Sequence, residues 1–137
     1  MPIKSYKFGP GELELDTLDV SLQVVGCQLN PTENVQTTDA IPTLGGEELP
    51  SEDVASYTYS LSGQLLQDIS LAGVVDWSWA NEGAEVPFRF VPSTAEGRSV
   101  TGVLRVVPLT IGGPEVKRRP TSDFDWKCIG KPDLGAL

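Results

Sequence analysis

Residues 74–92 read VVDWSWANEGAEVPFRFVP, and the change of pattern within this stretch decides the fold class. Its first part continues an apolar stripe at helical spacing, formed by Leu71, Val75 and Trp79. We therefore predict a short helix over residues 69–81, with Ser70 as its N-cap and an Asn-Glu-Gly stop after it. Its second part alternates apolar and polar residues, as a half-buried strand does.

The two tryptophans of this helix cannot share one face. At about 100° per residue, Trp79 lies on the apolar stripe and Trp77 lies about 200° away from it. We expect Trp79 to pack on a sheet, and Trp77 to be covered by a loop or by a neighbouring chain. A flat aromatic platform for a sugar is correspondingly disfavoured.

Working outward, the same alternation recurs on both sides and predicts a mainly β protein. Alternating segments occupy residues 11–29, 57–65, 85–91, 98–109 and 122–130. A break of phase at Gly26 predicts a β-bulge. We expect one domain over residues 1–137, an antiparallel β-sandwich or barrel of about seven or eight strands with one short flanking α-helix.

Residues 30–56 show no sustained period and are rich in proline and glycine, so they predict a long loop. Apolar residues are nevertheless spaced along it, namely Val35, Ile41, Leu44 and Leu49. Such a loop needs a surface to pack against, which is either its own domain or another subunit. Residues 131–137 are predicted to be a short C-terminal tail.

Composition narrows the function. The chain has 10 Lys and Arg against 19 Asp and Glu, a formal net charge of −9. This acidity argues against a nucleic-acid-binding face. The basic cluster at residues 117–119 is only weak evidence for one. Histidine is absent, which excludes Ser-His and Cys-His catalysis and histidine-bearing zinc sites. Cys27 and Cys128 are predicted to be two buried thiols in a reducing compartment.

No catalytic constellation emerges from the remaining residues. Acidic pairs such as Glu12/Glu14 and Asp123/Asp125 alternate on predicted solvent faces, where solvation is their ordinary role. The glycine pairs lack the residues of a phosphate-binding loop, and no calcium-loop spacing is present. We expect no enzyme, no metal and no cofactor. No run resembles a signal peptide or a transmembrane span, so we expect a cytoplasmic, soluble protein with no membrane step.

Three segments taken in order resemble a known family. They are SYTYSLSGQLLQDI (56–69), VVDWSWANEGAEVPFRFVPSTAEGRSVTGVLRVVPLTIGG (74–113) and RPTSDFDWKCIG (119–130). Together they resemble the major tail, or tail tube, proteins of long-tailed bacteriophages, especially phages of actinobacterial hosts. The resemblance covers a little over half of the chain.

The resemblance implies a structural virion protein whose copies form hexameric rings, stacked into a tail tube through which DNA passes without being bound. It implies assembly in the host cytoplasm and location in the virion tail. Implied partners are copies of the chain itself and the tape measure, tail terminator and distal tail proteins. The implied subunit contacts are Val35, Ile41, Leu44, Leu49 and Trp77. Candidate lumen-facing residues are Thr58, Ser60, Ser62 and Gln64, or alternatively Glu12 and Glu14.

Two other functions stay open at this point. A tail terminator or head-proximal tail protein would use the same fold in a different position of the tail. A small carbohydrate-binding β-sandwich would use Trp77 and Trp126, although Trp126 lies on the apolar face of its predicted strand.

Overall fold

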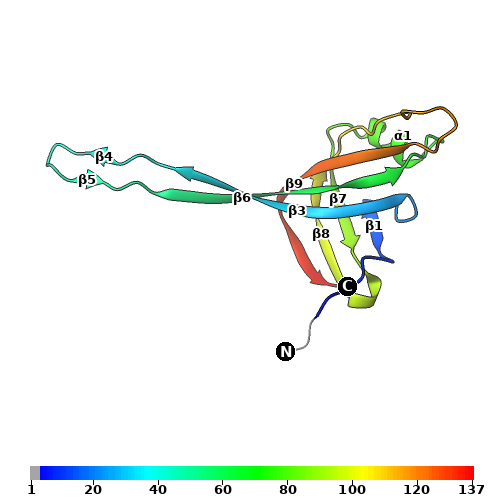
Figure 1. Cartoon of the computed structure of the whole chain (residues 1–137), viewed down its shortest axis with the longest axis horizontal. Helices are drawn as coiled ribbons and strands as arrows, with labels where there is room; N and C mark the ends of the chain where they lie inside the picture. Colours follow the sequence, from blue (N-terminus) through cyan, green and yellow to red (C-terminus); the bar gives the residue numbers. More distant parts are fainter. Residues whose placement is uncertain (1–3) are drawn as a thin grey trace.

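The computed structural model describes residues 4–137, and most of these residues form antiparallel strands (Figure 1). Seven strands make one sheet in the order β2-β1-β7-β8-β9-β6-β3, and β4 pairs with β5 separately. The strands are β1 (Glu12–Leu15), β2 (Leu18–Asp19), β3 (Val24–Thr37), β4 (Ile41–Pro42), β5 (Glu48–Leu49), β6 (Asp53–Leu66), β7 (Glu85–Val91), β8 (Arg98–Arg105) and β9 (Thr121–Ala136). The helix α1 spans Val74–Ala80, and a 3-10 turn spans Thr94–Glu96. The predicted mainly β, antiparallel fold with a short helix is confirmed.

The long strand β9 turns this sheet into two packed layers (Figure 1). Its first half, as far as Lys127, pairs with β6, and its second half, from Cys128, pairs with β8. One layer therefore contains β3, β6 and the first half of β9. The other contains β2, β1, β7, β8 and the second half of β9. The result is a half-open sandwich with a single core between the layers.

The core is built from the alternating side chains that the sequence predicted to face inward. Phe88 and Phe90 of β7 are buried opposite Leu61 of β6 and Trp126 of β9. The indole Nε1 of Trp126 donates to the backbone oxygen of Val107 at 3.0 Å, so the ring is buried without an unpaired donor. Burial of this apolar set supplies the main driving force for folding.

The predicted bulge at Gly26 is confirmed, because the register between β3 and β6 shifts between Val24 and Gly26. Leu22 falls on an inward position of the alternating segment 11–29, but it is 94% exposed. It lies in the turn between β2 and β3, where strand alternation does not apply.

The helix begins later than predicted and turns a different face to the core. It starts at Val74, after Gly73 as N-cap, and not after Ser70. Leu71, which set the predicted phase, lies outside the helix and is 93% exposed. The residues that α1 buries are Val74, Val75 and Ser78.

This shift reverses the predicted roles of the two tryptophans. Trp77 packs edge-on against Trp126, with ring centroids 6.4 Å apart, and belongs to the rim of the core. Trp79 is 52% exposed, and its Nε1 donates to the backbone oxygen of Leu109 at 2.9 Å. Trp77 therefore does not need a neighbouring chain to cover it.

Two segments predicted to be irregular are strands. Residues 30–56 form a β-hairpin, in which β3 and β6 stay paired as far as Thr37 and Asp53 and β4 pairs with β5 beyond them. In the predicted tail, residues 131–137, β9 continues as far as Ala136, and Asp133 to Ala136 pair with β8. The hairpin escaped prediction because nearly all of its side chains are exposed on both faces, so burial imposes no alternation.

The bulge allows a stability test. A Cβ on Gly63 would lie 2.0 Å from the backbone oxygen of Gly26, whereas a Cβ on Gly26 meets nothing within 4 Å. We expect Gly63→Ala to reduce the free energy of unfolding by about 1–3 kcal/mol, because the backbone of β3 must move. Gly26→Ala, its matched control, should change it by less than about 0.5 kcal/mol. Urea unfolding followed by circular dichroism measures both, and equal effects would contradict this packing.

Candidate assembly surfaces

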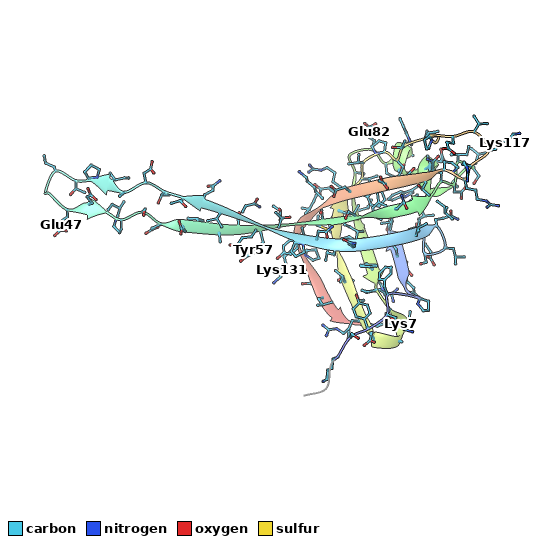
Figure 2. All side chains as sticks on the ribbon, in the orientation of Figure 1. Lys7, Glu47, Tyr57, Glu82, Lys117 and Lys131 are labelled. Carbon is cyan, nitrogen blue, oxygen red and sulfur yellow. The ribbon has the colours of Figure 1, made fainter. Side chains whose placement is uncertain are left out.

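The outstanding feature of the molecule is an arm, residues 31–59, that leaves the two-layer body as a β-hairpin (Figure 1). Pairing of β6 with β9 begins at Ser60, so within the arm β6 pairs with β3 alone. A strand rises about 3.3 Å per residue, so the fourteen residues 31–44 reach roughly 45 Å from the body. Figure 2 shows Glu47 near the far end of the arm and Tyr57 near its base.

The two faces of the arm continue the two faces of the sheet that it leaves. After the bulge the register runs without a shift from Gly26 to Thr37, so the alternation carries over from body to arm. The face that continues the core carries the pairs Pro31–Tyr59, Glu33–Tyr57 and Val35–Ala55. The face that continues the outside of the sheet carries Thr32–Thr58, Asn34–Ser56 and Gln36–Val54. One face is thus partly apolar, and the other is mostly polar.

Four predicted contact residues lie on the arm. Val35 is on its partly apolar face, Ile41 and Leu49 are cross-strand partners near the tip, and Leu44 is in the tip turn. All four are exposed, as are Val54 and Tyr57. A concentration of exposed apolar side chains on a thin projection is typical of a protein–protein contact. Contact of these residues with a second subunit stays a prediction.

A polar surface covers the outside of β3, β6 and β9. The predicted residues Thr58, Ser60, Ser62 and Gln64 all lie on it, in one row along β6. The flanking rows, which the sequence analysis did not assign, are Gln28, Asn30 and Thr32 on β3 and Asp123, Asp125 and Lys127 on β9. We call these rows the polar face. They were missed because cross-strand neighbours follow from the register, which the sequence alone did not give.

Side-chain hydrogen bonds tie the rows of the polar face together. The amide of Asn30 donates to the hydroxyl of Ser62 at 2.6 Å, and the amide of Gln64 donates to a carboxylate oxygen of Asp123 at 3.2 Å. In these rows the only charged residues are the three on β9. The face is therefore mostly neutral, hydrogen-bonding and ordered by its own cross-strand contacts.

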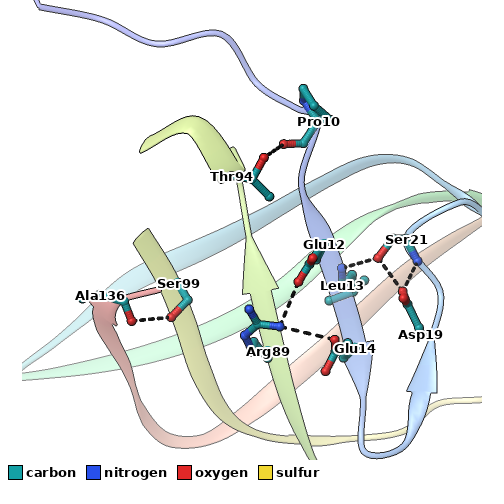
Figure 3. A network of polar contacts seen from close by, with 10 residues as sticks. All are labelled: Pro10, Glu12, Leu13, Glu14, Asp19, Ser21, Arg89, Thr94, Ser99 and Ala136. Atoms are coloured by element: carbon teal, nitrogen blue, oxygen red, sulfur yellow. Dashed lines mark hydrogen bonds and ion pairs between the residues drawn. The ribbon is translucent and has the colours of Figure 1, made fainter. Parts of the chain in front are cut away.

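The alternative lumen candidates lie on the opposite outer surface. Glu12 and Glu14 are on β1, with Leu13 and Leu15 between them and buried in the core. Figure 3 shows Arg89 of β7 between the two carboxylates, with Nη1 at 2.8 Å from Glu12 and 3.3 Å from Glu14. These carboxylates are thus ion-paired, and they share no surface with the row on β6.

Unpaired strand edges run along the whole polar face. Strand β3 ends the sheet order and pairs only with β6, so its second edge is free from Val24 to Thr37. Within the arm the outer edge of β6 is free as well. Free edges of this length are templates for pairing with another chain.

The cysteines and the acidic residues are the metal-binding side-chain types that the chain contains. Among residues 4–137 no three cysteine or acidic side chains lie close enough to hold a metal ion, and no helix in that range could cross a membrane. Both cysteines are free thiols, with Cys27 buried and Cys128 half-buried. Burial raises the pKa of Cys27 to about 12, so this thiol is protonated and unreactive at neutral pH.

Comparisons with known proteins give a shared fold. No protein-family model matches the chain, and no curated protein matches it. Among solved structures, a chain from the virion of a native gene transfer agent particle is similar, with a TM-score of 0.63 and 13% sequence identity. The similarity covers 92% of this chain and 95% of that chain. The fold described above is therefore one that a virion protein uses, over essentially its whole length.

The buried thiol predicts selective protection from alkylation. In a Cys128→Ser variant Cys27 is the only cysteine, and its pKa of about 12 leaves little thiolate. Compared with an ordinary thiol of pKa about 8.5, alkylation by iodoacetamide at pH 8 should be roughly a thousandfold slower. In urea the rate should return to that of a free thiol. Mass spectrometry of the native and unfolded samples measures both rates, and fast native labelling would contradict the burial.

Shortening the arm should leave the stability of the two-layer body unchanged. Thr37 and Asp53 are cross-strand partners, so residues 38–52 can be replaced by Asn-Gly as a two-residue turn. Because the deleted residues are exposed and outside the core, the free energy of unfolding should change by less than about 0.5 kcal/mol. Chemical unfolding of both chains tests this, and a large loss would show that the arm supports the body.

Proposed function

We propose that the protein is a structural virion subunit, a tail tube protein whose copies form hexameric rings that stack into the tube of a phage-like tail. The observation that carries the proposal is the arm, which projects from the body with exposed apolar side chains and two unpaired edges. The shared fold with a virion chain and the resemblance of the sequence to tail tube proteins support the same role.

The polar face is the proposed lining of the lumen. Serine, threonine, asparagine and glutamine carry no charge that attracts phosphate at a distance, and Asp123 and Asp125 repel it. Lys127 is the only cation in these rows, so release of counterions from DNA would contribute little to binding. Such a wall lets DNA pass without holding it. The ion-paired Glu12 and Glu14 are less suited, because Arg89 offsets part of their charge.

Assembly in the host cytoplasm and contacts with tape measure, tail terminator and distal tail proteins belong to this proposal. No catalytic role or cofactor is part of it. The carbohydrate-binding alternative is not pursued, because Trp126 is 1% exposed and Trp77 packs against it. The alternative role of a tail terminator or head-proximal tail protein predicts that the chain forms a single ring. A tube protein forms stacked rings.

Arm shortening tests the proposal directly. The purified full-length chain, concentrated and viewed by negative-stain electron microscopy, should form rings that stack into tubes. The chain with Asn-Gly in place of residues 38–52 should stay folded and form no tubes, because it lacks Ile41, Leu44 and Leu49. A full-length chain that stays monomeric at every concentration and salt contradicts the proposal, and single rings that never stack favour the terminator. If the shortened chain forms tubes, residues 38–52 of the arm are not needed for assembly.

Accessibility of the polar face gives a second test. A cysteine at Gln64 should react with a 5-kDa polyethylene glycol maleimide in the monomer, but much more slowly in tubes, where the lumen excludes the reagent. A cysteine at Glu12, on the opposite surface, serves as the matched control and should react in both states. Equal reactivity of the two positions in tubes would contradict the assignment of the lumen.

A further inference from the structure

The loop between β8 and β9, residues 106–120, concentrates positive charge at the end of the molecule opposite the arm. It carries Lys117, Arg118 and Arg119, three of the ten basic residues of the chain. Figure 2 shows Lys117 at one extreme of the long axis and Glu47 at the other. Only Arg118 has an ion-pair partner on this loop, Glu115 at 3.2 Å, and both side chains are well exposed. We call this segment the basic loop.

A single residue, Gln67, contacts both ends of the part of the basic loop that carries the cations, residues 112–120. The side-chain amide of Gln67, just after β6, donates to the backbone oxygen of Gly112 at 2.7 Å and accepts from the Gly112 N–H at 3.0 Å. The Gln67 backbone N–H donates to the oxygen of Pro120 at 3.3 Å. Lys117, in between, has a positive φ of 68°. The backbone of residues 112–120 is thus tied to the end of β6, and its three basic residues lie between the two tied points.

The arm has the opposite charge. Residues 31–59 contain six carboxylates and no Lys or Arg, a formal charge of −6 out of −9 for the whole chain. In the described part of the chain none of the ion pairs involves the arm. Its tip has a definite form, because the Thr43 N–H donates to the Glu47 oxygen at 3.0 Å and the Gly46 N–H to the Thr43 oxygen at 3.1 Å.

Both ends also expose apolar side chains beside their charges. Ile41, Leu44 and Leu49 are exposed at the arm tip, and Ile111 and Val116 are exposed on the basic loop. Contact between the two ends would bury apolar area and pair unlike charges together. The roughly 45 Å reach of the arm points away from the body, so the two ends of one molecule cannot meet.

We infer that the basic loop of one copy receives the acidic arm tip of a second copy, in a head-to-tail contact. This inference rests on the proposed function and specifies the surface on which the arm docks. Because donor and acceptor are different surfaces at opposite ends of the molecule, the contact is heterologous and stays open unless its rotation closes a ring. In the proposed stack of rings it joins successive layers along one direction.

Charge exchange tests the pairing. Two variants each place like charges opposite one another. The loop variant is Lys117→Glu/Arg118→Glu/Arg119→Glu, and the arm variant is Glu47→Lys/Glu48→Lys/Glu52→Lys. Each alone should raise the concentration needed for tube formation about tenfold or more. A mixture of the two should assemble near the wild-type concentration, because each arm then finds a loop of opposite charge. Sedimentation velocity and negative-stain microscopy measure the assembly.

A variant with the same change of net charge, Lys4→Glu/Lys7→Glu/Arg98→Glu, is the control and should assemble like the wild type. If it fails as fully as the loop variant, net charge and not the loop governs assembly, and the inference falls. If the wild type forms tubes and the loop variant forms them equally well, the inference is wrong and the proposed function is unaffected. Failure of the mixture to assemble overturns it as well. A wild-type chain that never assembles overturns both.

Discussion

The structure depends on one constraint: β3 and β6 stay paired well beyond the end of the core that they cover. Cys27, Leu61 and Leu65 are buried on these strands, but from Pro31 and Tyr59 outward the hairpin has no layer beneath it. An isolated two-stranded hairpin is marginally stable in water. The ladder of the arm continues a sheet that β9 fixes on one side, and both faces of the arm remain exposed in the single chain.

The sequence was sufficient for the parts of the fold that a core imposes. Phe88 and Phe90, Leu61 and Leu65, and Phe124 and Trp126 alternate because one side of each strand is buried, and this alternation identified the strands correctly. The arm gave no such signal, because both of its faces meet solvent. The same physical fact that makes it a candidate for assembly therefore hid its strands from a pattern analysis.

The errors in the helix and in the candidate site had different physical causes. Leu71 sits at helical spacing from Val75, yet α1 starts only at Val74, so a residue outside the helix fixed the wrong phase and exchanged the roles of Trp77 and Trp79. For the polar face, the row on β6 was visible as an alternation. Its neighbours on β3 and β9 lie up to about 65 residues away in sequence and are brought together only by strand register.

Continuity of register also constrains how copies can fit together. Since no shift occurs between Gly26 and Thr37, the polar face of the body runs on into the polar side of the arm, and the core side runs on into Tyr57 and Val35. A neighbouring copy that packs beneath the apolar side of the arm would extend the body in the direction of its core. The polar faces of the two copies would then join into one surface. In such a packing, burial of Tyr57 and Tyr59, which both lie on the core side of the arm, would fix the relative orientation of the two copies.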